Sequence, residues 1–543
     1  MSNRRSFVLV SVAVLLVALA VRLVPLYWSP LPFNLDGFHF AVLVRETLAT
    51  GHVPLSHGGV QSDEYAFTTL FAITSRITGI PPLYIAQYLT ASIGAISCLF
   101  VVVLTRRVGR RLRWPRSDVR TAAAVAGLVL ATDGIFLGRS AAVSSEGMGH
   151  VFVIMGVFVF GYALWTNRPA WYVLTGSIFF ILPLTHNLST IVGVLSAISL
   201  LALFLKRSES GPNVAAGALI VGFGVYTGLY YTTAGLPDAR VSSALGLFAA
   251  WIIVLVVLTL WLPSIDPRLQ RGVPTLILFG GAGLVVGNYF LPIFPGTAST
   301  RELTMVFVLS IAAIGIVAAR GTPLSIREGI DGYAVVAMLL ASLSLIGFAL
   351  TGGLTPEYQA LAVRTQTFVH LPFAILAGLG TVAVGLRRRT DRLKVMLAVI
   401  VIVCSVISAP LAYSGLRATS AQPLVTKPEM ETATFASTYA DQWTGDGHMT
   451  RLASRYYPER TGNNVTQRGV YEWLRGSGAE PSCPVVSRRS WSSVGVQLFP
   501  GSPAHISATE YDRFNDRRNV VYSVSGRDPV VYSVSRGNTN GRC

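Results

Sequence analysis

Long apolar stretches separated by short polar connections dominate the first three quarters of the chain. A helix of about 20 apolar residues crosses a hydrocarbon core of about 30 Å. Thirteen candidate stretches precede residue 414, of which the fifth and sixth are short, and none follows it. The pattern predicts a polytopic α-helical membrane protein with about 13 transmembrane helices. The predicted spans are 7–27, 83–105, 120–137, 149–166, 170–185, 188–205, 214–233, 241–262, 273–292, 303–320, 331–351, 367–386 and 393–413.

The connection between the first two spans, 28–82, is the longest one before the tail. Within it, residues 37–50 and 64–79 have helical periodicity but are too short or too polar to cross a membrane. Amphipathic segments of this kind commonly lie along the membrane surface. We therefore expect two interfacial helices in this connection.

The polar tail, residues 414–543, has the pattern of a small folded domain. The segments 520–525 and 530–535 both read VVYSVS, with largely alternating apolar and polar positions and four residues between them. This spacing predicts a β-hairpin. Residues 427–442 and 466–475 have helical periodicity. The tail is therefore expected to be an α/β domain, separate from a membrane domain formed by residues 1–413.

Composition excludes a soluble multidomain protein. Of the 543 residues, 52% are hydrophobic and 13% are charged, about half the charge of a typical soluble domain. Four cysteines are too few for a disulfide scaffold. Two of them, Cys98 and Cys404, fall in predicted spans, whereas Cys483 and Cys543 lie in the tail and can pair.

The net charge of +17 is distributed unevenly along the chain. Alternate connections carry 21 and 6 Lys and Arg residues, with the larger number on the side of the N-terminus. Basic connections stay cytoplasmic, which predicts a cytoplasmic N-terminus, an extracytoplasmic tail and no nucleic-acid partner. Arg4 and Arg5 also precede an apolar core as in a cleavable signal. That alternative leaves twelve spans and the same outward tail.

Candidate chemistry gathers on the predicted outer face, where all eight histidines fall. Asp36 and His39 follow the first span, and Glu146 lies one helical turn before His150. Carboxylates from several loops near arginines suit a site that deprotonates an acceptor while it holds a phosphate leaving group. The other candidates on this face are Arg139, Arg301, Glu302, Glu357 and Arg364.

Several short motifs resemble membrane glycosyltransferases of the GT-C superfamily, which take sugars from polyprenyl phosphate carriers. The string from Asp36 to Phe40, DGFHF, resembles the Asp-Glu-x-His-Phe motif of protein O-mannosyltransferases, with Gly37 in place of the glutamate. In that family the aspartate is the proposed catalytic base. The resemblance implies the same role for Asp36.

The overall layout resembles the catalytic subunit of oligosaccharyltransferases, including archaeal ones. Residues 299–302, STRE, match a Ser/Thr-x-x-Glu motif between spans nine and ten, and Arg364 lies where that family has a phosphate-binding arginine. The tail string 443–447, WTGDG, resembles the Trp-Trp-Asp-Tyr-Gly acceptor motif without its second Trp and its Tyr. Because the tail is small, the resemblance favours transfer of a single sugar, as in archaeal dolichol-phosphate-mannose mannosyltransferases.

The resemblance implies an inverting transfer of mannose or a similar hexose from a polyprenyl- or dolichyl-phosphate donor to a protein-bound glycan or a protein. Asp36 is the expected general base, and His39 its neighbour in the site. Arg364, helped by Arg139 or Arg301, offsets the phosphate charge. Glu146 positions the acceptor or shares Mg²⁺ or Mn²⁺ with Asp36. Glu302 and Glu357 are expected in loops at the acceptor side.

Two other functions compete with this interpretation. One is block transfer of a whole lipid-linked glycan, as in oligosaccharyltransferases. The other is a transporter, which usually carries ionisable groups at mid-membrane. Apart from charged residues and histidines in their first or last four positions, the predicted spans contain only two such residues: Arg22, close enough to the outer end to snorkel, and Asp133. Each site candidate also has a structural alternative: Asp36 as a helix cap, Glu146 as a first-turn acid and Arg364 as an interfacial anchor.

Overall fold

The computed structural model describes most residues of the chain. Those left outside the description are residues 1, 55–60, 208–213, 235–240, 242, 292, 294–299, 301, 328, 389, 414–422, 463, 499–502, 527 and 537–542. The predicted domain boundary at 413/414 falls at one of these segments. The side chains of residues 2–5, 207, 302, 303, 387 and 388 are also left out.

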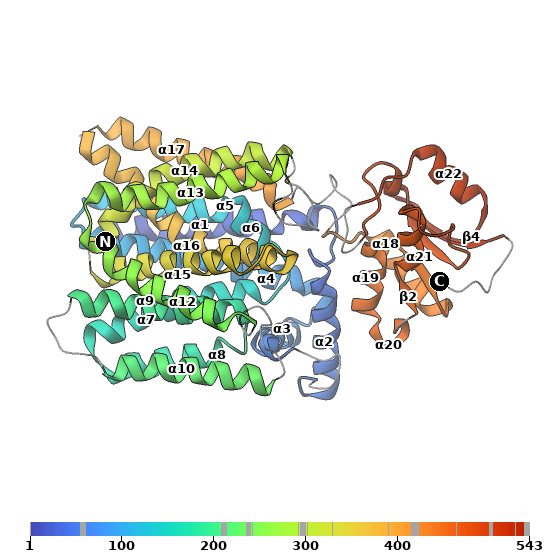
Figure 1. Ribbon diagram of the computed structural model, residues 1–543, viewed down its shortest axis with the longest axis horizontal. Coiled ribbons are helices and arrows are strands. Elements are labelled where there is room, and N and C mark those ends of the chain that lie inside the picture. Colours follow the sequence, from blue (N-terminus) through green and yellow to red (C-terminus); the bar gives the residue numbers. More distant parts are fainter. Residues whose placement is uncertain are drawn as a thin grey trace.

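The predicted apolar stretches form a bundle of helices that run side by side (Figure 1). Within the described residues, eleven helices are long and apolar enough to cross a membrane, or twelve if one bent pair is a single span. The fifth predicted stretch is a shorter helix of 13 residues. The helices are α1 (Ser2–Leu23), α4 (Pro82–Arg111), α5 (Arg116–Thr132), α6 (Gly134–Ala141), α7 (Glu146–Thr166), α8 (Pro169–Ile181), α9 (Asn187–Arg207), α10 (Val214–Thr233), α12 (Leu245–Trp261), α13 (Pro267–Phe290), α14 (Glu302–Arg327), α15 (Ile330–Gly352), α16 (Pro356–Arg388) and α17 (Asp391–Ser408).

The third predicted span is not one straight helix. The chain bends by 61° between α5 and α6, at Asp133, whose backbone is extended. The Asp133 side chain accepts hydrogen bonds from the backbone N–H groups of Ile135 and Phe136 and so caps α6. This capping residue, followed by Gly134, explains the break, and it directs α6 toward the candidate site.

Arg22 does not snorkel, contrary to the expectation from its position near the end of the first span. Its side chain is fully buried. It donates to Ser140 Oγ (3.1 Å) and to the Ala131 carbonyl (3.4 Å), and its guanidinium lies over the Phe136 ring. These groups flank the α5–α6 break, where carbonyls lose their partners within the helix. Arg22 therefore stabilises the bend instead of reaching the interface.

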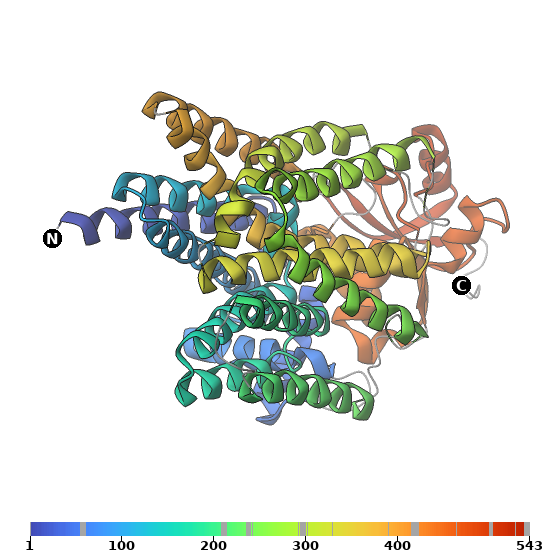
Figure 2. The same ribbon diagram turned by 60° about the vertical axis from the view of Figure 1, so that its left-hand side comes forward.

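The two expected interfacial helices are present. α2 (Asp36–Thr50) and α3 (Tyr65–Thr78) lie across the bundle axis, at the same end as the C-terminal domain (Figure 1). Each ends at a glycine in the left-handed conformation, Gly51 or Gly79, where an L side chain would be strained. The start of α1 lies at the opposite end of the bundle, as Figure 2 also shows.

The C-terminal domain contains a five-stranded mixed sheet with strand order β2-β1-β3-β5-β4. β1 pairs in parallel with β2 and β3, and the predicted hairpin is the antiparallel pair β4–β5. Both predicted helices are present as α18 and α21. The elements are α18 (Lys427–Tyr439), β1 (Trp443–Gly445), α19 (Gly447–Tyr456), α20 (Pro458–Thr461), β2 (Val465–Thr466), α21 (Arg468–Leu474), β3 (Val485–Arg488), α22 (Ala508–Asp516), β4 (Arg518–Val524) and β5 (Val530–Ser535).

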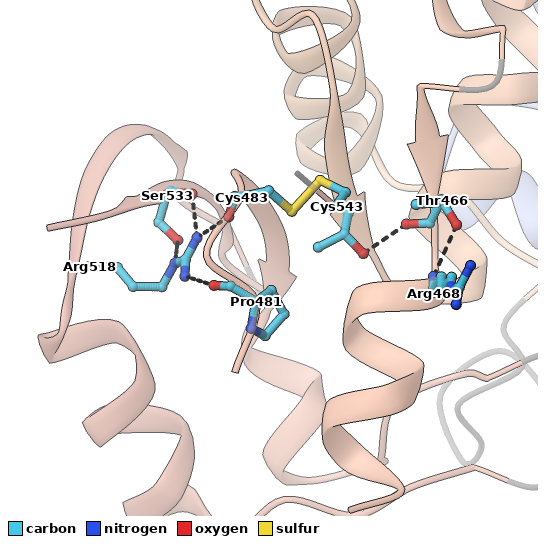
Figure 3. The surroundings of a disulfide bond; sticks show 8 residues. Thr466, Arg468, Pro481, Cys483, Arg518, Ser533 and Cys543 are labelled. Atoms are coloured by element: carbon cyan, nitrogen blue, oxygen red, sulfur yellow. Dashed lines mark hydrogen bonds between the residues drawn. A yellow bond between two sulfur atoms is a disulfide. The ribbon is translucent and has the colours of Figure 1, made fainter. Parts of the chain in front are cut away.

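A disulfide joins Cys483, just before β3, to Cys543 (Figure 3). Beside it, the buried Arg518 donates to the carbonyls of Pro481 and Cys483 and to Ser533 Oγ. The disulfide closes a loop with a sequence separation of 60 residues. Such a cross-link stabilises a fold mainly by reducing the entropy of the unfolded chain.

Trp443 and Asp446, the residues that resemble an acceptor motif, are buried in the C-terminal domain. Asp446 caps α19 and accepts bonds from Arg488 Nη2 (2.6 Å) and Trp491 Nε1 (2.8 Å). Arg488 also pairs with Glu429 at 2.8 Å. These residues therefore hold the domain together and present no surface to an acceptor.

The C-terminal domain packs directly against the 28–82 connection. Phe33 forms a β-bridge with Leu424, and Ser29 Oγ donates to the Val425 carbonyl. Phe38 of α2 belongs to a hydrophobic cluster made largely of residues of the C-terminal domain, and its ring packs edge-on against Tyr456 of α19. The first turn of α2 is thus held between the bundle and the domain.

Candidate functional site

A polar cluster lies where α7, α9 and α16 meet. Glu146, the first residue of α7, is buried, and its Oε2 lies 3.4 Å from Arg364 Nε on α16. Thr367, one turn along α16, donates to Glu146 Oε1 at 3.1 Å. The N-terminal end of a helix also favours a negative charge. Both oxygens of Glu146 thus have partners, and its carboxylate holds Arg364 in place.

Two histidines complete this polar cluster. His186, in the turn before α9, lies with Nε2 2.7 Å from Arg364 Nη2. Arginine can only donate, so His186 Nε2 accepts, and its Nδ1 carries the proton toward Ser189 Oγ at 2.8 Å. His150 Nε2 lies 3.0 Å from Thr367 Oγ1. The guanidinium of Arg364 is therefore fixed from two sides, while 32% of its side chain remains exposed.

A glycine allows this close approach. Gly149 lies on α7 between Glu146 and His150, where a Cβ would overlap Ser189 Oγ and approach His186. Without a side chain at this position, α7 and the start of α9 can pack closely. The sequence Glu146-Gly147-Met148-Gly149-His150 thus brings the carboxylate and His186 to the same arginine.

Asp36 lies at the first position of α2, on the side that faces the C-terminal domain. One of its oxygens accepts from Asn34 Nδ2 (3.1 Å), and the other lies 3.6 Å from Arg455 Nη2 of α19. The Asp36 side chain is 47% exposed. Leu35 is the N-cap of α2, so Asp36 is not the capping residue. The site is therefore formed by both parts of the protein.

Two further carboxylates lie near Asp36 and were not predicted as site residues. Asp63 and Glu64 precede α3, and each has one buried oxygen without a hydrogen-bond partner among the described residues. Burial, with Asp63 and Asp36 nearby, raises the pKa of Glu64 to about 8. Burial also raises the pKa of Asp63. We call Asp36, Asp63 and Glu64 the acid cluster.

The acid cluster and the polar cluster are adjacent. Asp63 Oδ2 accepts from the backbone N–H of Asn187, the residue after His186, at 3.3 Å. The charge of Arg364 favours the ionised form of Asp63 and thus acts to lower its pKa. On the other side, the charge of Arg455 acts to lower the pKa of Glu64. Two arginines, one from each part of the protein, therefore flank the three carboxylates.

His39 lies one turn after Asp36 on α2. Burial and the nearby Arg455 lower its pKa, so this imidazole is neutral at pH 7. A neutral histidine near the acids can accept or donate a hydrogen bond without adding charge. The structure thus places His39 beside Asp36, as expected from the sequence.

Arg139 lies in the last turn of α6 and lines a groove of about 460 Å³. The groove also contains Asn34 next to the acid cluster and Thr367 of the polar cluster. Its remaining lining is mostly apolar and comes largely from α13, α14, α16 and the segment after α17, with Val285, Val308, Ile311, Val363 and Leu411 among its residues. The groove therefore combines a cation and hydroxyl and amide groups with an extended apolar surface.

The remaining predicted site residues lie elsewhere or cannot be placed. Glu357 is exposed in the first turn of α16, two turns before Arg364. Arg301 lies outside the described residues. Glu302 begins α14, but its side chain also lies outside the description.

Asp36 and Glu146 as arranged do not fit the shared Mg²⁺ or Mn²⁺ site expected from the sequence. Glu146 uses both oxygens for Arg364 and Thr367, and Asp36 faces Arg455 and Asn34. Such cations need several oxygen ligands at once. The described residues contain no group of three or more Asp, Glu, His or Cys side chains suited to a metal ion.

Comparison with known proteins gives matches among solved structures only. No family model and no curated protein sequence matches the chain. The oligosaccharyltransferase of Archaeoglobus fulgidus in its apo form matches over 98% of this chain and 75% of its own, at 13% identity and a TM-score of 0.52. Its complex with an inhibitory peptide and a dolichol-phosphate covers 97% and 74%, at 13% identity and a TM-score of 0.50.

A third structure of that enzyme, in complex with Zn and sulfate, matches over 98% of this chain and 73% of its own, at 13% identity and a TM-score of 0.50. ArnT from Cupriavidus metallidurans bound to undecaprenyl phosphate matches over 98% of this chain and 99% of its own at 12% identity, but its TM-score of 0.35 is too low to indicate a shared fold. At these identities the likeness establishes the fold alone. The chain has the fold of the archaeal oligosaccharyltransferase AglB.

Proposed function

We propose that this chain is a membrane glycosyltransferase that uses a polyprenyl- or dolichyl-phosphate sugar donor. The observation that carries the proposal is the groove lined by Arg139 and Thr367, which places a cation and an apolar surface next to the acid cluster. A lipid phosphate needs both features at once, a cation for its head and apolar side chains for its tail. The AglB structure that resembles this fold holds a dolichol-phosphate.

In this proposal the arginines act on the donor phosphate and the acid cluster acts on the acceptor. Arg139 and Arg364 offset the negative charge that develops on the phosphate as the glycosidic bond breaks. Asp36 accepts the proton of the acceptor hydroxyl, whose oxygen attacks the anomeric carbon from the face opposite the phosphate. The bond to the phosphate oxygen breaks, polyprenyl phosphate leaves, and the sugar inverts its configuration. No step uses a metal ion.

Glu64 and His39 assist the acceptor in this scheme. With a pKa of about 8, Glu64 is mostly protonated at pH 7 and can donate a hydrogen bond. His39 is neutral beside Asp36. Glu146 acts through Arg364, because its two oxygens are occupied. We assign it a positioning role, in place of the metal-binding role considered from the sequence.

We infer that the acceptor is a protein-bound glycan or a protein and that one sugar, mannose or a similar hexose, is moved. The burial of Trp443 and Asp446 supports this over block transfer, because the tail then lacks the acceptor motif it resembles. Reaction at the outer face follows from the charge asymmetry, which predicts a cytoplasmic N-terminus and an extracytoplasmic C-terminal domain.

Glycan analysis of cell-surface proteins tests the proposal. A strain that lacks this chain is complemented with wild type, with Asp36→Asn, or with Glu46→Gln as an exposed carboxylate control on the same helix. We expect glycans one residue short in the deletion and with Asp36→Asn, and complete glycans with Glu46→Gln. Complete loss of glycans would indicate block transfer. Unchanged glycans in the deletion would overturn the proposal.

A further inference from the structure

A second polar hollow is lined by Ser6 and Phe7, near the start of α1. This end of α1 lies at the opposite end of the bundle from the C-terminal domain (Figure 2). Its volume is about 220 Å³, several times the roughly 30 Å³ that one water molecule occupies. Three helices contribute to its lining. These residues are Ser6 and Phe7 of α1, Arg106 and Arg110 of α4, and Arg116 and Arg120 of α5.

The four arginines form two pairs with like charges one helical turn apart. Neighbours at this spacing repel each other and destabilise a helix. No carboxylate among the described residues lies within ion-pair distance of Arg106, Arg110 or Arg120. The nearest acid in sequence, Asp118, pairs instead with Lys394 at 2.7 Å. Arg106, Arg110 and Arg120 therefore carry positive charge in the hollow that no carboxylate among the described residues neutralises.

The adjacent arginines on α4 behave differently. Arg107 and Arg111 both pair with Asp331 of α15, at 3.5 and 2.5 Å. A basic helix end that only sets membrane topology would not need a carboxylate partner for Arg107 and Arg111 and none for Arg106 and Arg110. One face of α4 is neutralised inside the protein, and the other is left for an external anion.

Neutral partners hold two of these arginines in place. The guanidinium of Arg106 lies 3.7 Å from the centre of the Phe7 ring, and Arg120 Nη1 donates to Ser6 Oγ at 2.8 Å. An arginine has five N–H donors, so both keep donors for another ligand. The planar guanidinium group can donate two parallel hydrogen bonds to a phosphate.

The surface next to the hollow points to a lipid as the source of the phosphate. Val8, Leu9 and Val12 follow Phe7 on α1, and their side chains are 56%, 68% and 44% exposed. In a membrane these residues face acyl chains. Basic pockets between membrane helices on the cytoplasmic side bind anionic headgroups, and the charge asymmetry predicts that this end is cytoplasmic.

We propose that this hollow is a binding site for the phosphate headgroup of an anionic membrane lipid. Arg106 and Arg120 contact the phosphate, and the acyl chains extend along Val8 and Val12. The site is independent of the proposed transfer reaction and lies at the other end of the bundle. The lipid would stabilise the ends of α1, α4 and α5 against one another.

Thermal unfolding of the full-length protein with added lipid tests this proposal. Wild type, Arg106→Gln/Arg120→Gln and Arg268→Gln/Arg392→Gln are compared in detergent with phosphatidylglycerol, phosphatidylcholine or inorganic phosphate. The second double variant is the control, since both residues are exposed and lie outside the hollow. Native mass spectrometry of retained lipid gives an independent measurement on the same samples.

Phosphatidylglycerol is expected to raise the melting temperature of wild type and of the control, because a ligand that binds only the folded state stabilises it. For Arg106→Gln/Arg120→Gln we expect at least about tenfold weaker lipid retention. Equal retention by all three proteins would overturn the proposal. Stabilisation of wild type by phosphatidylcholine or by inorganic phosphate as strong as that by phosphatidylglycerol would also overturn it.

Discussion

Arg364 of α16 donates a hydrogen bond of 2.7 Å to Nε2 of His186, a residue 178 positions earlier in the chain. Glu146 lies on another side of the same guanidinium, at 3.4 Å. The arginine is therefore oriented by a neutral acceptor as well as by a negative charge. Orientation matters here, because a planar fork binds a phosphate well only when it is aimed correctly.

Replacing His186 by Phe is expected to weaken donor binding. Phe removes the acceptor of the Arg364 bond and keeps an aromatic ring, whereas Gln keeps an acceptor oxygen. A lost hydrogen bond to a charged group corresponds to a change of roughly tenfold or more. We expect KM for the polyprenyl-phosphate sugar to rise by about that factor in His186→Phe and by less in His186→Gln. The exposed His52 provides the control, His52→Gln; equal KM values in all variants would contradict a positioning role.

Asp36→Asn is expected to lower kcat while leaving donor binding nearly unchanged. The amide cannot accept the proton of the acceptor hydroxyl, and general-base contributions amount to about 10²–10⁴-fold in rate. Single-turnover measurements with purified enzyme and radiolabelled donor separate this effect from binding. Glu64→Gln serves as the comparison. A larger loss of kcat in Glu64→Gln than in Asp36→Asn would move the role of general base to Glu64.

Much of the architecture could be predicted from the sequence because its signals are local. Apolar length identified most membrane helices, periodicity identified α2 and α3, and the repeated VVYSVS identified the β4–β5 hairpin. The bend at Asp133 was not predicted, although Asp133 followed by Gly134 is a helix-capping signal. The burial of Arg22 depends on Ala131 and Ser140, more than 100 residues away, which no local pattern reveals.

The candidate site was predicted only in part, because several of its contacts join residues that are far apart in the sequence. Asp36, Glu146 and Arg364 were recognised from their positions at the ends of spans. Asp63 and Glu64 were not among the candidates, because acids just before a helix are commonly helix-start residues. Their proximity to Asp36 follows from the packing of the 28–82 connection. His186 had a signal, since all histidines fall on the predicted outer side, but its bond to Arg364 requires α9 and α16 to meet.

The raised pKa of Glu64 predicts a pH-dependent stability. Its pKa is about 8 in the folded chain, against an ordinary value of 4.5. Between these values the folded chain binds a proton that the unfolded chain does not, so this contribution to stability falls as pH rises from about 5 to 8. Glu64→Gln cannot titrate. Its melting temperature relative to wild type should therefore rise across this window and level off above pH 8, whereas that of Glu46→Gln should stay constant; a flat difference for Glu64→Gln would contradict the raised pKa.

Arg455 is expected to tune the acids of the site from the C-terminal domain. It lies 3.6 Å from Asp36, and its charge acts to lower the pKa of both Glu64 and His39. The other charged groups that act on these residues are Asp36, Asp63 and, through Asp63, Arg364. Removing the cation favours protonated carboxylates. Arg455→Gln should therefore move the acidic limb of the kcat–pH profile to higher pH.

Arg45→Gln is the matched control for this experiment. Arg45 lies at the same interface, with its guanidinium 5.5 Å from the centre of the Tyr456 ring, but it forms no ion pair with Asp36. Both variants remove one positive charge between α2 and α19, so a loss of domain packing alone would affect them alike. A shift of the acidic limb in Arg455→Gln only would show that the C-terminal domain takes part in the chemistry. Equal profiles for the two variants would restrict Arg455 to a structural role.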